Sequence, residues 1–253
     1  MNSAPWKAIF DKYKIGEHNF NKEPFIITAQ QIRDATRQHF KKTNEIEARI
    51  LCKQDSRENR PDVFIENNLF ILPVKNKIYI IVKGEGYVDI PLIKNTVTIH
   101  KSKLDFQLDT SKIGNSEMQH LDFAYASSII RTFMNDDSLV LTIRGRKYTP
   151  QFSFNIGKQL VEVDGVQTEV DAGYEGKNKV VLIEAKNSKT DNVIIRQLFY
   201  PFRQWSRHTK KDVLTLFFEK QSDNYLLWQF QFTDKNDYNS IQLAKTCKFQ
   251  ILE

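Results

Sequence analysis

Apolar runs bounded by turn residues dominate the second half of the chain and predict strands over 139–143, 152–156, 160–163, 166–172, 180–185, 213–218 and 225–232. Residues 117–134 instead repeat apolar positions at helical spacing. A second helix is expected over 191–205, kinked or ended early by Pro201. This order favours an α/β (α+β) domain with a mixed central sheet flanked by helices.

The first third of the chain predicts helices followed by a hairpin. Thr28 is a suitable N-cap for a helix reaching Phe40, and Asn44 could cap a second over 45–54. Two apolar runs, 69–74 and 78–82, are joined by Lys75-Asn76-Lys77 and predict a β-hairpin. Helices followed by a hairpin resemble a winged-helix DNA-reading module. We therefore expect a module over 1–95 and a second domain over 96–253, with a soft boundary between them.

Composition sets few limits beyond a globular protein. The 253 residues are 40% hydrophobic and 27% charged, with a net charge of +6. No apolar run approaches the roughly 20 residues that span a bilayer, and the first residues lack the layout of a signal peptide. Two cysteines without metal-type spacing argue against a disulfide framework or a zinc site. These features predict a cytoplasmic protein without membrane contact.

The segment from Val161 to Lys186 carries the most specific chemistry. Glu184 and Lys186 are two residues apart in an apolar strand, so their side chains should share one face. A turn within 173–178 would bring Asp171 opposite Glu184 across the ladder. Two carboxylates form an oxygen-rich site for a hard divalent cation, and a neighbouring lysine can polarise water or stabilise phosphate charge. The hairpin therefore predicts metal-dependent phosphodiester hydrolysis.

Asp171, Glu184, Ala185 and Lys186 together resemble the PD-(D/E)xK nuclease signature, with Val170 in place of its proline. The wider sequence is similar to type II restriction endonucleases of bacteria and archaea. The resemblance implies Mg²⁺ held by Asp171, Glu184 and the backbone carbonyl of Ala185, with no organic cofactor. It also implies double-stranded DNA as substrate and a homodimer, because a palindromic site mirrors a two-fold axis.

Two further residues are candidate catalytic groups. Glu117 opens the first helix of the nuclease domain and resembles the helix glutamate that many such nucleases place near the metal. An acidic residue in a first turn is also favourable against the helix dipole alone. Gln197, on the helix after the signature, could touch the cleaved phosphate or orient water. Glu169 could be a ligand of a second metal ion or a surface residue.

Basic and amide side chains are clustered at several points that could bind DNA. Residues 53–60 form a polar string, and arginine, glutamine and asparagine can make bidentate contacts with base edges. A loop or a solvated face explains the same clusters without DNA. The candidate DNA-binding residues are Lys53, Gln54, Arg57, Asn59, Arg60, Arg144, Arg146, Lys147, Arg196 and Arg203.

Other mechanisms have little support in the sequence. The five histidines are scattered, no Walker-type phosphate loop is present, and no serine lies in a nucleophile elbow. The resemblance described above thus implies a Mg²⁺-dependent, sequence-specific double-stranded DNA endonuclease of the type II restriction class. Two alternatives stay open: a repair or junction-processing nuclease on the same core, and a DNA-binding regulator without catalytic activity.

Overall fold

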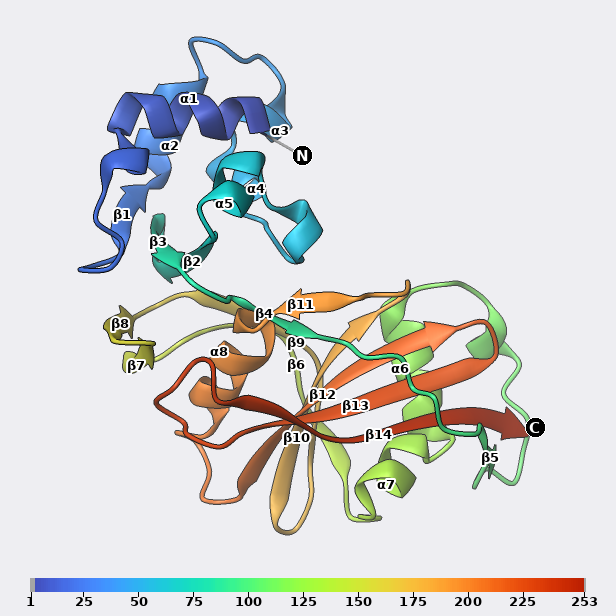
Figure 1. Ribbon diagram of the computed structural model, residues 1–253. Helices are drawn as coiled ribbons and strands as arrows, with labels where there is room; N and C mark the ends of the chain where they lie inside the picture. The colour runs from blue at the N-terminus through green and yellow to red at the C-terminus, as the bar shows by residue number, and fades with distance from the viewer. Residues whose placement is uncertain (1–2, 253) are drawn as a thin grey trace.

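A seven-stranded mixed sheet forms the centre of the protein (Figure 1). The structure is a computed structural model that describes residues 3–252, except for the side chain of Lys112. The strand order of the sheet is β5-β14-β13-β12-β10-β9-β6. The β10–β12 and β14–β5 pairs are parallel and the others antiparallel. The strands are β5 (Thr98–Lys101), β6 (Val140–Tyr148), β9 (Gln167–Glu175), β10 (Lys179–Lys186), β12 (Asp212–Gln221), β13 (Asn224–Phe232) and β14 (Ile241–Leu252).

Helices cover both faces of this sheet. On one face α6 (Glu117–Ala126) and α7 (Ile129–Met134) pack over Val181, Ile183 and Ala185 of β10. The alternate residues Val180 and Leu182 belong to a cluster on the other face, which α8 (Arg196–Trp205) covers together with the short strands β4 (Tyr87–Asp89) and β11 (Asn192–Ile194). Because side chains alternate along β10, Glu184 and Lys186 lie on the same face as Val180 and Leu182, the face that α8 covers.

The N-terminal module, residues 3–83, lies beside the sheet domain (Figure 1). Its antiparallel sheet has the order β1-β3-β2, and its core is built around Trp6 and Phe64, whose ring centroids are 4.7 Å apart. The elements are α1 (Ser3–Tyr13), β1 (Phe25–Thr28), α2 (Ala29–Thr36), α3 (Thr43–Ile46), α4 (Ala48–Leu51), α5 (Asp62–Glu66), β2 (Leu69–Lys75) and β3 (Ile78–Lys83).

The second face of the β2–β3 hairpin belongs to a core that both parts of the chain share. Phe70 and Val82 pack in one cluster with Phe154 of β7 (Phe152–Ile156) and with Phe199 of α8. The strand β8 (Gln159–Val163) contributes to the same cluster. The Tyr200 hydroxyl donates to the carbonyl of Pro73 at 3.0 Å. The two parts are therefore joined by buried apolar surface as well as by the chain.

Most predicted strands are present, and the mixed α+β class is confirmed. Thr28 caps α2 through a capping box with Gln31. The helix ends at Thr36, however, and does not reach Phe40. The second predicted helix is divided into α3 and α4 because Glu47 between them is extended, with ψ of 117°.

Two other helix predictions were wrong in detail. Residues 117–134 form two helices because Ser128 adopts a left-handed conformation, with φ of 67°. Residues 191–195 are not helical; β11 precedes α8, which then continues through Pro201 to Trp205. Proline removes one helical hydrogen bond, but Phe199 and Tyr200 are fully buried and their packing holds the helix in place. None of the described helices has the length and apolar character needed to cross a membrane.

Candidate active site

A bulge in β9 sets the position of Asp171. Between the pairs Ile143–Gly173 and Gly145–Val170, β6 advances by two residues and β9 by three. Gly145, opposite the extra residue, has φ of +82°, which glycine adopts without strain. The β9–β10 ladder ends at the pair Ile183–Ala172, and beyond it the Asp171 carboxylate accepts the Ala185 N–H at 2.8 Å. The bulge thus directs a carboxylate to the end of the ladder.

Glu184 and Lys186 lie on the same side of β10 and form an ion pair. The Gln197 amide, on α8, donates to the Glu184 carboxylate at 2.7 Å. Glu184 is only 9% exposed, and this burial, together with the charges of Asp171 and Asp55, raises its pKa to about 7 despite the opposing effect of Lys186. An ionised Glu184 is therefore costly unless a further positive charge is close to it.

The pKa values of Asp171 and Lys186, the neighbours of Glu184, are also shifted. Burial raises the pKa of Asp171, with a contribution from Glu117 and Glu169, against the effects of the Ala185 N–H and Lys186. Burial alone would lower the pKa of Lys186, but Glu184 and Asp171 outweigh it and the pKa is raised. Lys186 is thus an ammonium group at neutral pH, able to donate hydrogen bonds but not to act as a base.

Glu117 joins this site from the first residue of α6, where Ser116 caps the helix. Its carboxylate accepts the Asn187 N–H at 3.3 Å, just beyond the end of β10. Glu169 instead pairs with Arg146 at 3.2 Å. Glu117 therefore serves both the helix N-terminus and the carboxylate cluster, so the two interpretations of this residue are compatible.

All five predicted catalytic residues line one cleft of about 800 Å³. They come from α6, β9, β10 and α8, and residues of the N-terminal module complete the lining. Within residues 3–252, no group of three or more His, Cys, Asp or Glu side chains could hold a metal on its own. A site for Mg²⁺ would therefore depend on Asp171, Glu184, backbone oxygen and water, a donor set that magnesium accepts. The five predicted catalytic residues in its lining are Glu117, Asp171, Glu184, Lys186 and Gln197.

The predicted DNA-binding residues are divided between this cleft, the surface and the interior. Lys53, Arg146 and Arg196 line the cleft. Arg144 pairs with Asp122, and Lys147 is exposed, both on β6.

Two of the predicted DNA contacts do not fit their positions. Gln54 is 2% exposed, inside the N-terminal part. Arg203 is 9% exposed; it donates to the Ser153 carbonyl at 3.0 Å and lies 5.0 Å from the ring centroid of Phe152. Both side chains belong to the fold, because burial withdraws them from any surface that DNA could reach. Residue type in the sequence could not reveal that burial.

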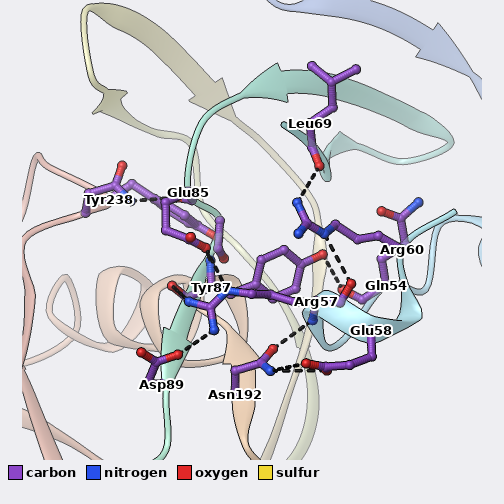
Figure 2. A network of polar contacts seen from close by, with 12 residues as sticks. Gln54, Arg57, Glu58, Arg60, Leu69, Glu85, Tyr87, Asp89, Asn192 and Tyr238 are labelled. Atoms are coloured by element: carbon purple, nitrogen blue, oxygen red, sulfur yellow. Dashed lines mark hydrogen bonds and ion pairs between the residues drawn. The ribbon is translucent and has the colours of Figure 1, made fainter. Parts of the chain in front are cut away.

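Arg57 and Arg60 take part in a polar network between the N-terminal part and β4 (Figure 2). Arg57 pairs with Asp89 and Glu85, and its backbone N–H donates to Asn192 at 2.7 Å. Arg60 donates to the Leu69 carbonyl at 3.2 Å. These arginines are occupied within the protein, and Asn59 lies between them on the 3-10 turn Arg57–Asn59. The string that we predicted to read bases is here a connection between the two parts.

Asn192 and Asp55 are functional candidates that the sequence did not indicate. The Asn192 amide donates to Glu58 at 2.8 Å, and the Asp55 carbonyl accepts the Ile194 N–H at 2.9 Å. The Asp55 carboxylate lies 3.8 Å from Arg196 at the start of α8. Because these partners are more than 130 residues apart, no local pattern relates them. Together they fix the helix that carries Gln197.

Replacing Asn192 by alanine should destabilise the protein by about 1 to 3 kcal/mol, because it leaves buried donors and acceptors unpaired. Asn192 is 3% exposed and bridges the Arg57 N–H and the Glu58 carboxylate. Chemical denaturation would measure the change. The matched control is Asn67→Ala on the exposed end of α5, where only one local bond to Val63 is lost. Equal stability of the two variants would contradict the assigned role.

Comparison with known proteins gives matches to two families, which meet between residues 81 and 82, inside β3. Residues 3–81 match the family described as Domain of unknown function (DUF6996). Residues 82–250, which include all five residues of the carboxylate cleft named above, match the family described as Domain of unknown function (DUF6997). No curated protein and no solved structure matches the chain. Since the second match covers more than half of the chain, the protein belongs to the DUF6997 family.

Proposed function

We propose that the protein is a Mg²⁺-dependent, sequence-specific endonuclease of double-stranded DNA, similar to type II restriction enzymes with a PD-(D/E)xK core. One observation carries the proposal: Asp171, Glu184 and Lys186 line one cleft from adjacent strands, and the glutamate pKa is raised to about 7. Perturbed carboxylates beside an ammonium group in a cleft are typical of a catalytic site. The expected reaction is hydrolysis of a phosphodiester bond.

The residues of the site suit a divalent cation. Burial raises the pKa of both carboxylates, and the charge of Asp171 raises the pKa of Glu184 further, so a cation between them would offset both their burial and their repulsion. Asp171, Glu184 and the backbone carbonyl of Ala185 would hold Mg²⁺. When bound, the metal stabilises phosphate charge and lowers the pKa of a coordinated water. The carboxylate oxygens support magnesium over softer metals.

The remaining groups orient the reactants. Lys186 is protonated and fixed by Glu184, so it donates to a phosphate oxygen or to the attacking water. Gln197 holds the Glu184 carboxylate in one orientation from α8. Glu117 adds negative charge beside Lys186 and helps to keep it protonated.

The N-terminal module supports a DNA-reading role. It runs helix, strand, helices and then a hairpin, with sheet order β1-β3-β2, which is similar to a winged-helix module. A dedicated reader favours a sequence-specific enzyme over a repair nuclease. A homodimer is part of the proposal, because two copies related by a two-fold axis would cut both strands of a palindromic site.

The decisive experiment incubates the full chain with phage DNA in Mg²⁺ and, separately, in EDTA. We expect discrete fragments in Mg²⁺ and intact DNA in EDTA, and mapping the ends would give the recognised sequence. A smear would instead favour a repair-type nuclease. A mobility shift without cleavage in either condition would contradict the enzyme and favour a DNA-binding regulator.

A further inference from the structure

Eight basic side chains line the cleft, and they fall into two groups. The first group is paired with carboxylates: Lys53 and Arg196 with Asp55, Arg146 with Glu169, and Lys186 with Glu184. In the part of the chain that the structure describes, the second group has no carboxylate within ion-pair distance. Its members are Arg33, Arg49, Lys75 and Lys77.

These four cations all belong to the N-terminal module. Arg33 lies on α2, Arg49 on α4, and the two lysines at the tip of the β2–β3 hairpin. Arg49, Lys75 and Lys77 are exposed, and Arg33 is half-buried, with a bond to the Gln30 amide oxygen at 3.1 Å. Because none of the four forms an ion pair among the described residues, an anion can bind them without disrupting an ion pair of the protein. They are also absent from the polar string that the sequence suggested as the DNA reader.

The carboxylates of the same cleft repel a phosphate that approaches them. The charge of Glu117 raises the pKa of Asp171, and the charge of Asp171 raises the pKa of Glu184. All three carboxylates raise the pKa of Lys186, so negative charge is concentrated here. A nucleic acid backbone can bring a phosphate to this position only if cations along its path compensate, and duplex DNA carries one negative charge per roughly 1.7 Å of helix axis. The unpaired cations of the module meet this requirement.

We propose that Arg33, Arg49, Lys75 and Lys77 bind phosphates of the same DNA stretch whose phosphodiester lies at Asp171 and Glu184, so that the cut falls inside the footprint of the N-terminal module. This inference rests on the proposed nuclease function, which it deepens. A module placed away from the carboxylates would instead leave the cut outside its footprint. Here the cleft is lined by both parts of the chain, so reading and cutting share one segment of DNA.

The test combines a charge-removal variant with a matched control. The variant carries Arg33→Gln, Arg49→Gln, Lys75→Gln and Lys77→Gln. The control carries Lys7→Gln, Lys14→Gln, Lys22→Gln and Lys41→Gln, which remove the same number of charges; these lysines are exposed on the same module and do not line the cleft. Binding of a short duplex of random sequence is measured in EDTA over a range of salt concentrations. Hydroxyl-radical footprinting of Glu184→Gln on a cleaved sequence, compared with the ends made by the natural protein, places the cut.

We expect the slope of log affinity against log salt to fall by about 3 to 4 in the cleft variant, at about 0.9 per lost phosphate contact. The control should fall by less than about 1. The cut should lie within the protected stretch, and protection at its ends should weaken in the cleft variant. An unchanged slope, or a cut outside the footprint, would overturn the inference.

The binding arm separates this inference from the proposed activity. It needs no cleavage, so a lowered slope in the cleft variant alone would support the phosphate-binding surface even if Mg²⁺ produced no fragments. Cleavage by the natural protein with equal slopes in both variants would retain the nuclease and remove the surface. A single-stranded probe that binds as tightly as the duplex would overturn the duplex as the occupant.

Discussion

Glu184→Gln is expected to abolish cleavage and, at the same time, to make the metal-free protein more stable at pH 8. The substitution removes a proposed Mg²⁺ ligand while keeping the shape of the side chain and an oxygen for Gln197. The protonated carboxyl is the form that the fold prefers, because the pKa is about 7 in the folded protein against 4.5 for an unperturbed glutamate. Glutamine has the shape of that neutral form. The pKa of about 7 already includes the attraction between Lys186 and the ionised carboxylate, so this attraction does not reverse the expected gain in stability.

The sign of the pH dependence follows from this difference. Below pH 4.5 the carboxyl is protonated in the folded and unfolded chain, and Glu184 costs nothing. As the pH rises towards 7 the unfolded chain ionises first, so the natural protein loses stability, by about 3 kcal/mol once both states are ionised. The gain from Glu184→Gln should therefore appear between about pH 4.5 and 7 and stay constant above.

Thermal unfolding of both proteins in EDTA at pH 4 and pH 8 would measure this effect. Glu175→Gln is the control, since Glu175 lies on β9 outside the cleft and pairs with Lys211. The control should keep full cleavage and show no such gain. Cleavage by Glu184→Gln at the natural rate would remove Glu184 from the site. A loss of stability at pH 8 would contradict the buried, costly carboxylate.

Lys186→Gln should lower the rate of cleavage by about 100-fold to 10,000-fold while DNA binding in EDTA is retained. The substitution removes the ammonium group that faces Glu184 and Asp171. Because Lys186 lowers the pKa of Glu184, its loss should raise that pKa further. The residual activity should then need a higher pH than the natural protein, at a fixed Mg²⁺ concentration.

Single-turnover cleavage over a range of pH would separate this role from a merely structural one. Lys189→Gln is the matched control, because Lys189 is exposed, pairs with Asp191 and lies outside the cleft. Its rate and pH profile should match those of the natural protein. A Lys186→Gln variant with a reduced rate but an unshifted profile would show that the lysine does not act through Glu184.

Local patterns in the sequence predicted the strands and the β9–β10 hairpin because alternation and turns are local properties. The same alternation placed Glu184 and Lys186 on one side of β10. It could not predict the bulge that directs Asp171, since the extra residue is defined only against β6. Pairing of β5 with β14 is equally invisible, because it joins residues about 150 positions apart.

Burial and spatial convergence account for the remaining differences. Arg57 and Arg203 are charged in sequence, but their partners Asp89 and Ser153 come from distant segments that only the folded chain brings near. The cleft cations gave no pattern in the sequence because Arg33, Arg49 and the hairpin lysines meet the carboxylates only across the interface of two parts. The residue types in the sequence were enough to predict the chemistry of the site, whereas the contacts of these residues could be identified only in the folded structure.

The apolar cluster shared by the β2–β3 hairpin, β7, β8 and α8 has a consequence for how the chain folds. The boundary between the two family matches, after residue 81, cuts through β3 and therefore through this cluster. Each half alone would expose aromatic surface that the other half now covers. The chain should accordingly unfold in one cooperative step, and its N-terminal module could not be replaced by an unrelated domain without exposing this cluster.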